Sequence, residues 1–152
     1  MTEHEVLTWQ TYGEAARELS HRVSASDFRP DIVLGIARGG LVLAASLAYG
    51  LGSKNLFSIN VEFYTGEGTT LSTPLMLPPY LDTSDLDDAR VLVVDDVADT
   101  GKTLELVMRF CDGHVAEARS AVLYQKPTTV LEADFVWRET DRWIPFPWSS
   151  DL

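Results

Sequence analysis

Apolar residues between Trp9 and Val23 recur at intervals that place them on one face of a helix. Thr11, followed three positions later by Glu14, offers a capping box near the start of this segment. The pattern therefore predicts an amphipathic helix over residues 9–23. A polar linker, residues 24–30, follows it.

Beyond the linker, strand-like and helical patterns alternate. Short apolar runs rich in β-branched residues are typical of buried strands, and turn residues follow most of them. The predicted strands are Asp31–Ile36, Leu56–Val61, Arg90–Val94, Ala118–Tyr124 and Asp134–Trp137, and the predicted helices are Leu41–Tyr49 and Thr103–Cys111. This alternation predicts an α/β fold with a mostly parallel, twisted sheet flanked by helices, in a single domain over residues 1–152.

Two segments fit neither pattern. Residues 62–80 contain several glycines, threonines and prolines, which predicts a long irregular loop, and loops of this length often act as flexible lids. Phe63 and Tyr64 would cover a site beneath it. Residues 143–148 are aromatic and rich in proline, so they cannot form a long helix.

Composition narrows the class of protein and its expected location in the cell. The 152 residues suit one domain, and 45% hydrophobic with 23% charged residues are typical of a soluble globular protein. The single cysteine, Cys111, excludes an internal disulfide framework and falls in a helical pattern, which predicts a buried side chain. Neither a signal peptide nor an apolar run of about 18 residues is visible, so we expect a cytoplasmic protein without a membrane partner.

The formal net charge of -11 argues against nucleic acid as a partner, because binding its backbone requires clustered Lys and Arg. A small phosphorylated substrate remains compatible with this charge, since it needs only a few local donors and a metal ion can offset nearby carboxylates.

Candidate chemistry gathers where the predicted strand at residues 90–94 ends. Asp95 and Asp96 follow it directly, and Asp99 opens a loop of small polar residues before a helix. The carboxylates could accept hydrogen bonds from a vicinal diol, while backbone N–H groups at the helix start could bind a phosphate. A diol beside a phosphate describes a ribose 5-phosphate. In open α/β sheets, ligands bind beyond such strand ends.

Two other interpretations compete for this segment, and a third concerns the glycine turn after Ile36. One is a surface turn in which Asp99 merely caps the helix, but this leaves the paired acids unexplained. A P-loop would need a glycine at the position of Asp96, and a carboxylate there would repel the phosphates. The glycines at 35, 39 and 40 do not fit the dinucleotide-binding spacing.

The run from Val93 to Thr103 resembles the phosphoribosyl pyrophosphate signature of type I phosphoribosyltransferases. Its surroundings resemble the short xanthine-guanine and hypoxanthine-guanine branch of bacteria and archaea. The matching segments occur in the same order and are Leu7–Trp9, Ile36–Val42, Tyr124–Pro127 and Arg142–Trp148.

The resemblance implies a type I phosphoribosyltransferase fold and gives the signature residues their roles. Asp95 and Asp96 would hold the ribose hydroxyls, with Asp96 also contacting a magnesium ion or its waters. Asp99 would act as the general acid or base near N7 of a purine. The 5-phosphate would be cradled by Thr100, Gly101, Lys102 and Thr103. The pyrophosphate loop, which carries a non-proline cis peptide in many relatives, would be formed by Ala37, Arg38 and Gly39.

The same resemblance implies a base-binding hood over residues 126–152. Lys126 would hydrogen-bond the exocyclic O6, and a protonated lysine only donates, which favours 6-oxopurines over adenine. Trp143 would stack on the base, and backbone carbonyls around Ile144 would accept hydrogen bonds from it. The implied reaction is a Mg²⁺-dependent transfer from phosphoribosyl pyrophosphate to N9 of guanine, xanthine or hypoxanthine, in a homodimer or homotetramer.

One position departs from the family pattern. Several relatives carry an acidic residue after the second tryptophan of the C-terminal motif, whereas Ser149 follows Trp148 here. The choice of base therefore stays open. A regulator that senses phosphoribosyl pyrophosphate or a nucleotide, and a phosphoribosyltransferase for a different base, remain alternative interpretations.

Overall fold

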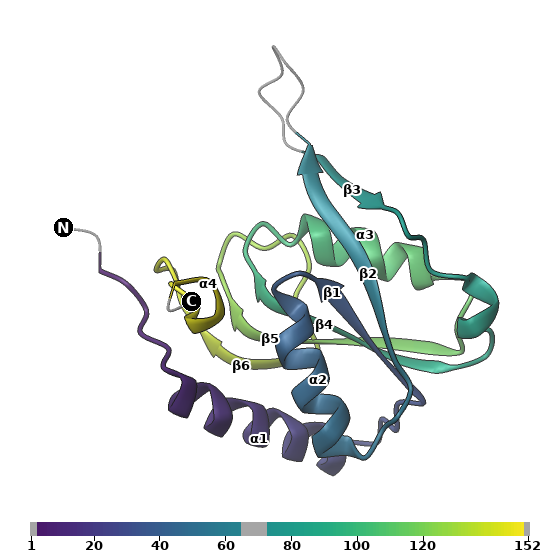
Figure 1. Cartoon of the computed structure of the whole chain (residues 1–152), viewed down its shortest axis with the longest axis horizontal. Helices are drawn as coiled ribbons and strands as arrows, with labels where there is room; N and C mark the ends of the chain where they lie inside the picture. Colours follow the sequence, from purple (N-terminus) through teal and green to yellow (C-terminus); the bar gives the residue numbers. More distant parts are fainter. Residues whose placement is uncertain (1–2, 65–72, 151–152) are drawn as a thin grey trace.

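The computed structural model describes residues 3–64 and 73–150, which form a six-stranded sheet with helices on both faces (Figure 1). The strands are β1 (Ile32–Ala37), β2 (Leu56–Tyr64), β3 (Thr73–Leu77), β4 (Arg90–Ala98), β5 (Glu117–Gln125) and β6 (Phe135–Glu139). The helices are α1 (Trp9–Ala25), α2 (Gly40–Leu51), the 3-10 helix η1 (Thr83–Leu86), α3 (Lys102–Cys111) and the short α4 (Pro147–Ser150). The predicted α/β fold is confirmed.

The strand order is β3-β2-β1-β4-β5-β6, and every neighbouring pair except β2 and β3 is parallel. Parallel strands end at the same edge of a sheet. The last residues of β1, β4 and β5, which are Ala37, Ala98 and Gln125, therefore lie along one edge, with Ala98 and Gln125 directly paired. Most of the predicted site residues lie at or just after these strand ends, whereas Trp143 and Ile144 follow β6.

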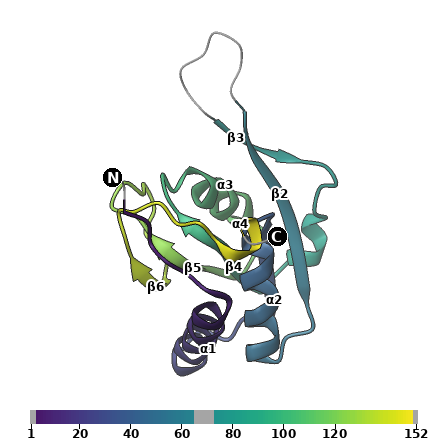
Figure 2. The ribbon, with the colours of Figure 1, turned by 60° about the vertical axis from the view of Figure 1, so that its left-hand side comes forward.

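Side chains alternate between the two faces of the sheet. Leu92 and Val94 pack in one core with α1 and α2, whereas Val91 and Val93 pack in a second core with η1 and α3. Figure 2 shows the two layers, with α1 and α2 on one side of the sheet and α3 on the other. Cys111 is fully buried in the second core, as predicted.

The ends of several elements differ from the sequence-based prediction. Helix α1 begins at Trp9 with Thr8 as its N-cap, because the Thr8 Oγ1 accepts the Thr11 N–H at 3.0 Å. The predicted capping box at Thr11 is therefore wrong by one turn. Helix α2 continues to Leu51 and is closed by Gly52, whose φ of 69° suits glycine.

The prediction of an irregular loop over residues 62–80 is wrong for most of its described part. Strand β2 continues to Tyr64, and β3 pairs with it antiparallel, with Phe63 opposite Pro74. Proline is tolerated there because β3 is the edge strand and has only one partner. Residues 65–72, which connect β2 and β3 in the sequence, lie outside the described residues, so the lid stays a prediction.

Membrane spans were sought among the helices of residues 3–64 and 73–150. None of these helices combines the length and the apolar run that crossing a bilayer requires.

Candidate active site

A cavity of about 180 Å³ opens where the strands end. Phe63 of β2 forms one wall, and the rest comes from the end of β4, the loop after it and the start of α3. Six of the predicted site residues line it, namely Asp95, Asp96, Asp99, Thr100, Gly101 and Thr103. The structure thus brings the residues that were predicted to bind a diol and a phosphate into one cavity.

The acid pair at the end of β4 is largely buried. The Asp95 side chain accepts the Asp96 N–H at 2.8 Å, and the Asp96 side chain accepts the Val97 N–H at 2.8 Å. Burial, reinforced by the charge of Asp96, raises the pKa of Asp95 well above its usual range, and burial also raises the pKa of Asp96. A pair in this state is stabilised by any ligand that brings hydroxyl donors or positive charge.

The loop between β1 and α2 lies directly against this acid pair. Its Ala37–Arg38 peptide is cis, and the Arg38 carbonyl accepts the Leu41 N–H at 3.0 Å. A Cβ atom on Gly39 would lie 2.1 Å from the Asp96 Oδ2, so this close approach requires glycine. The Arg38 side chain is exposed.

The loop between β4 and α3 presents the start of a helix to the cavity. Gly101 is the N-cap of α3 with a φ of 79°, and its carbonyl accepts the Glu105 N–H at 2.9 Å. The Thr100 hydroxyl accepts the Lys102 N–H at 3.3 Å, which fixes the turn. Free N–H groups and the helix dipole make such a turn an anion-binding element. The Lys102 side chain is exposed, and Thr103 is half-buried.

Lys126 and Trp143 flank Asp99 from the other side. The Lys126 Nζ lies 3.5 Å from the Asp99 Oδ2 and 6.0 Å from the centre of the Trp143 ring. The Lys126 side chain is only 14% exposed, whereas Trp143 is 60% exposed. Trp143 is therefore not a core aromatic, and much of its side chain is accessible to a ligand. The Ile144 side chain is buried, which leaves only its backbone for binding.

The N-terminal segment also reaches this region, which the sequence pattern did not predict. The Glu5 N–H donates to the Trp143 carbonyl at 2.9 Å, and the Thr140 hydroxyl donates to the Glu5 carboxylate at 3.2 Å. Arg142 forms an ion pair with Glu3 at 2.8 Å. Residues 3–5 have no periodicity that could have shown these contacts. The N-terminal segment therefore helps to position Trp143, and the Trp143 carbonyl already accepts a hydrogen bond from Glu5.

Comparisons with known proteins agree with this geometry. The family model described as the phosphoribosyl transferase domain matches residues 3–152. The chain belongs to this family.

Three similar phosphoribosyltransferases illustrate the range of relatives. The xanthine-guanine phosphoribosyltransferase of Nitratidesulfovibrio vulgaris is 33% identical over 96% of this chain and 85% of its own length. The purine phosphoribosyltransferase of Pyrococcus horikoshii, a crystal structure, is 38% identical with a TM-score of 0.82, covering 93% of this chain and 91% of that one. The structure of the Helicobacter pylori xanthine-guanine-hypoxanthine phosphoribosyltransferase also has a TM-score of 0.82, at 25% identity, covering 99% and 96%.

The acid pair of this phosphoribosyltransferase fits a magnesium site that substrate phosphates complete better than a site made of protein side chains alone. The described part of the chain has no group of three or more His, Cys, Asp or Glu side chains placed to hold a metal. Mg²⁺ is commonly held by one or two carboxylates together with substrate phosphates. Asp96, whose Oδ2 faces Gly39 in the loop between β1 and α2, could be one of these carboxylates.

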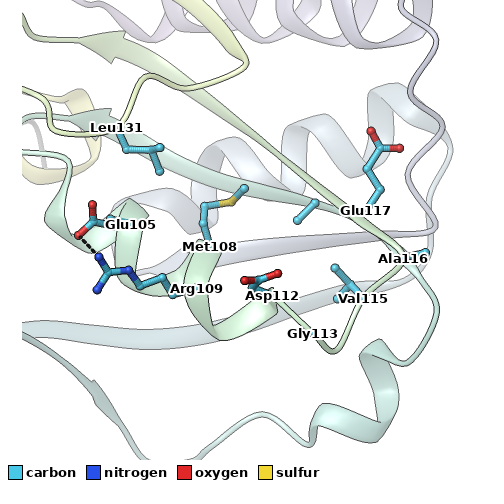
Figure 3. Close-up of a pocket in the computed structure, with 10 residues that line it drawn as sticks. Glu105, Met108, Arg109, Asp112, Gly113, Val115, Ala116, Glu117 and Leu131 are labelled. Carbon is cyan, nitrogen blue, oxygen red and sulfur yellow. Dashed lines mark ion pairs between the residues drawn. The ribbon is translucent and has the colours of Figure 1, made fainter.

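A second hollow, of about 420 Å³, lies along α3 and the start of β5 (Figure 3). An ion pair between Glu105 and Arg109, at 3.3 Å, marks one end of it. None of the predicted site residues lines this hollow. The smaller cavity at the strand ends, which six of these residues line, is therefore the candidate active site.

Proposed function

We propose that this protein transfers the 5-phosphoribosyl group of phosphoribosyl pyrophosphate to N9 of a 6-oxopurine in a Mg²⁺-dependent reaction. The observation that carries the proposal is the position of Lys126, a largely buried cation between the Asp99 carboxylate and the exposed Trp143 ring. Two of the relatives are named for xanthine and guanine, and a third for xanthine, guanine and hypoxanthine.

The sugar phosphate fits the cavity at the end of β4. The ribose hydroxyls would donate to Asp95 and Asp96, replacing the water that burial removes from these carboxylates. The 5-phosphate would accept hydrogen bonds from the turn 100–103 at the start of α3. The diphosphate would then face the loop at Gly39, with the Arg38 guanidinium as a charged donor.

The base would lie on the Trp143 ring with N7 toward Asp99 and its oxo group toward Lys126. An ammonium group only donates hydrogen bonds, so it suits a carbonyl oxygen and disfavours the amino group of adenine. Adenine has no acceptor at this position and would lack the hydrogen bond from Lys126, so we expect it to bind more weakly than a 6-oxopurine.

The proposed reaction is a substitution at the anomeric carbon. The bond to the diphosphate oxygen breaks as N9 forms the new bond, and Asp99 accepts the proton that N7 loses. Arg38 stabilises the charge that develops on the leaving diphosphate, and the Asp95–Asp96 pair stabilises the positive charge on the ribose ring. Magnesium, held by Asp96 and the phosphates, would supply further charge stabilisation.

Diphosphate release, measured with phosphoribosyl pyrophosphate and Mg²⁺, tests this proposal. Guanine, xanthine, hypoxanthine, adenine, uracil and orotate are compared in parallel, with a chelator as the control for the metal. We expect turnover with one or more of the three 6-oxopurines and none with adenine. Turnover with adenine or a pyrimidine would refute the assignment of Lys126, and no turnover with any base would refute the transferase.

A further inference from the structure

The segment from Lys126 to Val130 forms three hydrogen bonds with the start of the phosphate loop. The Lys126 N–H donates to the Ala98 carbonyl at 2.9 Å, which continues the pairing of β4 and β5. The Thr128 hydroxyl donates to the Asp99 carbonyl at 2.9 Å, and the Val130 N–H donates to the Thr100 carbonyl at 2.8 Å. The carbonyls of residues 98, 99 and 100 thus each accept a hydrogen bond, and their donors are residues 126, 128 and 130 in the same order.

The two segments are also in direct van der Waals contact. A Cβ atom on Gly101 would lie 2.1 Å from the Thr129 Oγ1 and 2.9 Å from the Val130 nitrogen. A turn closed by the Thr129 N–H and the Lys126 carbonyl, at 3.1 Å, keeps the segment in shape. The phosphate loop therefore rests on residues that directly follow the base-side Lys126.

The bond from Thr128 holds the peptide group that joins Asp99 to Thr100. Because this group is planar, its carbonyl and the Thr100 N–H turn together. Thr128 fixes the carbonyl, while Lys126 pairs with the Asp99 carboxylate at 3.5 Å. Rotation of this peptide would redirect the Thr100 N–H, which the proposed function assigns to phosphate binding. Thr128 therefore restrains the backbone of Asp99, and Lys126 restrains its carboxylate.

We infer that Thr128 is a positioning residue, which couples the orientation of the phosphate loop and of Asp99 to the Lys126 side of the site. This inference rests on the proposed function for its kinetic consequences. Its structural content, that one hydroxyl orders the loop 99–102, holds independently of turnover. Thr128 is also the only one of the three donors that is a side chain, so a substitution can remove this bond alone.

Thr128→Val removes the hydroxyl and keeps the shape, and Thr128→Ser keeps the hydroxyl as the matched control. Losing one hydrogen bond of ordinary strength predicts a decrease of about threefold to tenfold in kcat and in the affinity for phosphoribosyl pyrophosphate. Hydrogen exchange of the amides at 99–102 should quicken by a similar factor. Thr128→Ser should stay near the wild type in all three measurements.

Two results would overturn the positioning role. One is a valine variant whose kinetics and exchange match the wild type. The other is equal loss in both variants, or faster exchange spread over β4 and β5, because either would indicate general destabilisation. An inactive wild-type protein would instead refute the proposed function, and the exchange at 99–102 would then decide the role of Thr128 alone.

Discussion

A single run, residues 95–103, supplies the groups assigned to the sugar and its 5-phosphate, whereas the base side takes Lys126 and Trp143 from separate segments. The phosphate half is made largely of backbone groups and buried carboxylates. The base half is made of side chains, and its most exposed member, Trp143, is held by a bond from the N-terminal residue Glu5.

This difference distinguishes binding groups that follow from the fold itself from binding groups that depend on individual side chains. The turn at the start of α3 exists wherever β4 and α3 are joined in this way, because its donors belong to the backbone. The base half depends on side chains at the end of β5 and after β6, so substitutions there alter the choice of base without altering the turn. Specificity is expected to vary on the base side and the transfer chemistry to stay with the phosphate side.

Asp99 lies where the two halves meet, so its substitution should have the largest effect. Asn cannot take the proton from N7, and we expect Asp99→Asn to lower kcat by about 10²–10⁴-fold. Binding of phosphoribosyl pyrophosphate, measured by calorimetry, should change little. Asp112→Asn, an exposed aspartate at the far end of α3, is the control. Unchanged turnover in Asp99→Asn would remove this residue from proton transfer.

Lys126→Met should have the next largest effect, and it should impair use of the base but not binding of phosphoribosyl pyrophosphate. The loss of a charged hydrogen bond predicts a decrease of about 10- to 100-fold in kcat/KM for the base. Affinity for phosphoribosyl pyrophosphate should stay within about twofold, because no phosphate-binding group is removed. Lys54→Met, an exposed lysine, serves as the control. Equal losses for base and sugar phosphate would contradict the division of the site into halves.

The same comparison explains what the sequence predicted well. The order of strands and helices and the positions of the Asp95–Thr103 run followed from local patterns, since each lies within one continuous segment. The approach of Gly39 to Asp96 and the support of Trp143 by Glu5 join residues far apart in the chain. No periodicity records such contacts, because they arise only when the sheet assembles.

The hairpin was mispredicted for a related reason. Its prolines and glycines indicated an irregular loop, but the edge position of β3 makes the missing proline N–H harmless. Whether a strand is at an edge is a property of the whole sheet. The sequence alone could therefore place Phe63 near the site but could not place it on a strand.

Asp95→Asn tests whether the phosphate half lowers the stability of the ligand-free protein. Because burial raises the pKa of Asp95 in the folded state, folding binds protons, and this group destabilises the fold increasingly as pH rises above about 3.9. Asn removes that penalty but keeps an oxygen for the Asp96 N–H. We expect the free energy of unfolding at pH 7 to rise by about 1 kcal/mol.

Urea denaturation at neutral and acidic pH measures this effect. The gain from Asp95→Asn should shrink as the pH falls toward the ordinary carboxyl pKa, while binding of phosphoribosyl pyrophosphate at pH 7 weakens. The same Asp112→Asn variant controls for the loss of one surface charge. A gain that does not depend on pH would show that ionisation of Asp95 is not its cause.

Substitution of Tyr124, a residue of β5 close in sequence to Lys126, should have the smallest effect. Its ring is fully buried between Trp137 and Phe146, at centroid distances of 5.6 Å and 6.2 Å. Within residues 3–64 and 73–150, its hydroxyl has no hydrogen-bond partner, and burial raises its pKa to about 12. Tyr124→Phe should therefore leave the free energy of unfolding unchanged or raise it by up to about 1 kcal/mol, with the KM for the base unaltered.

Tyr12→Phe is the matched control for Tyr124→Phe, because the Tyr12 hydroxyl donates to the Val42 carbonyl at 2.9 Å. Its removal should cost about 0.5–1.5 kcal/mol in the same urea denaturation. Opposite signs for the two variants would show that apolar packing alone holds the Tyr124 side chain. A loss in Tyr124→Phe equal to that in Tyr12→Phe would indicate a buried water on the Tyr124 hydroxyl. Such a water would add a polar contact to the aromatic packing of Tyr124 against Trp137 and Phe146.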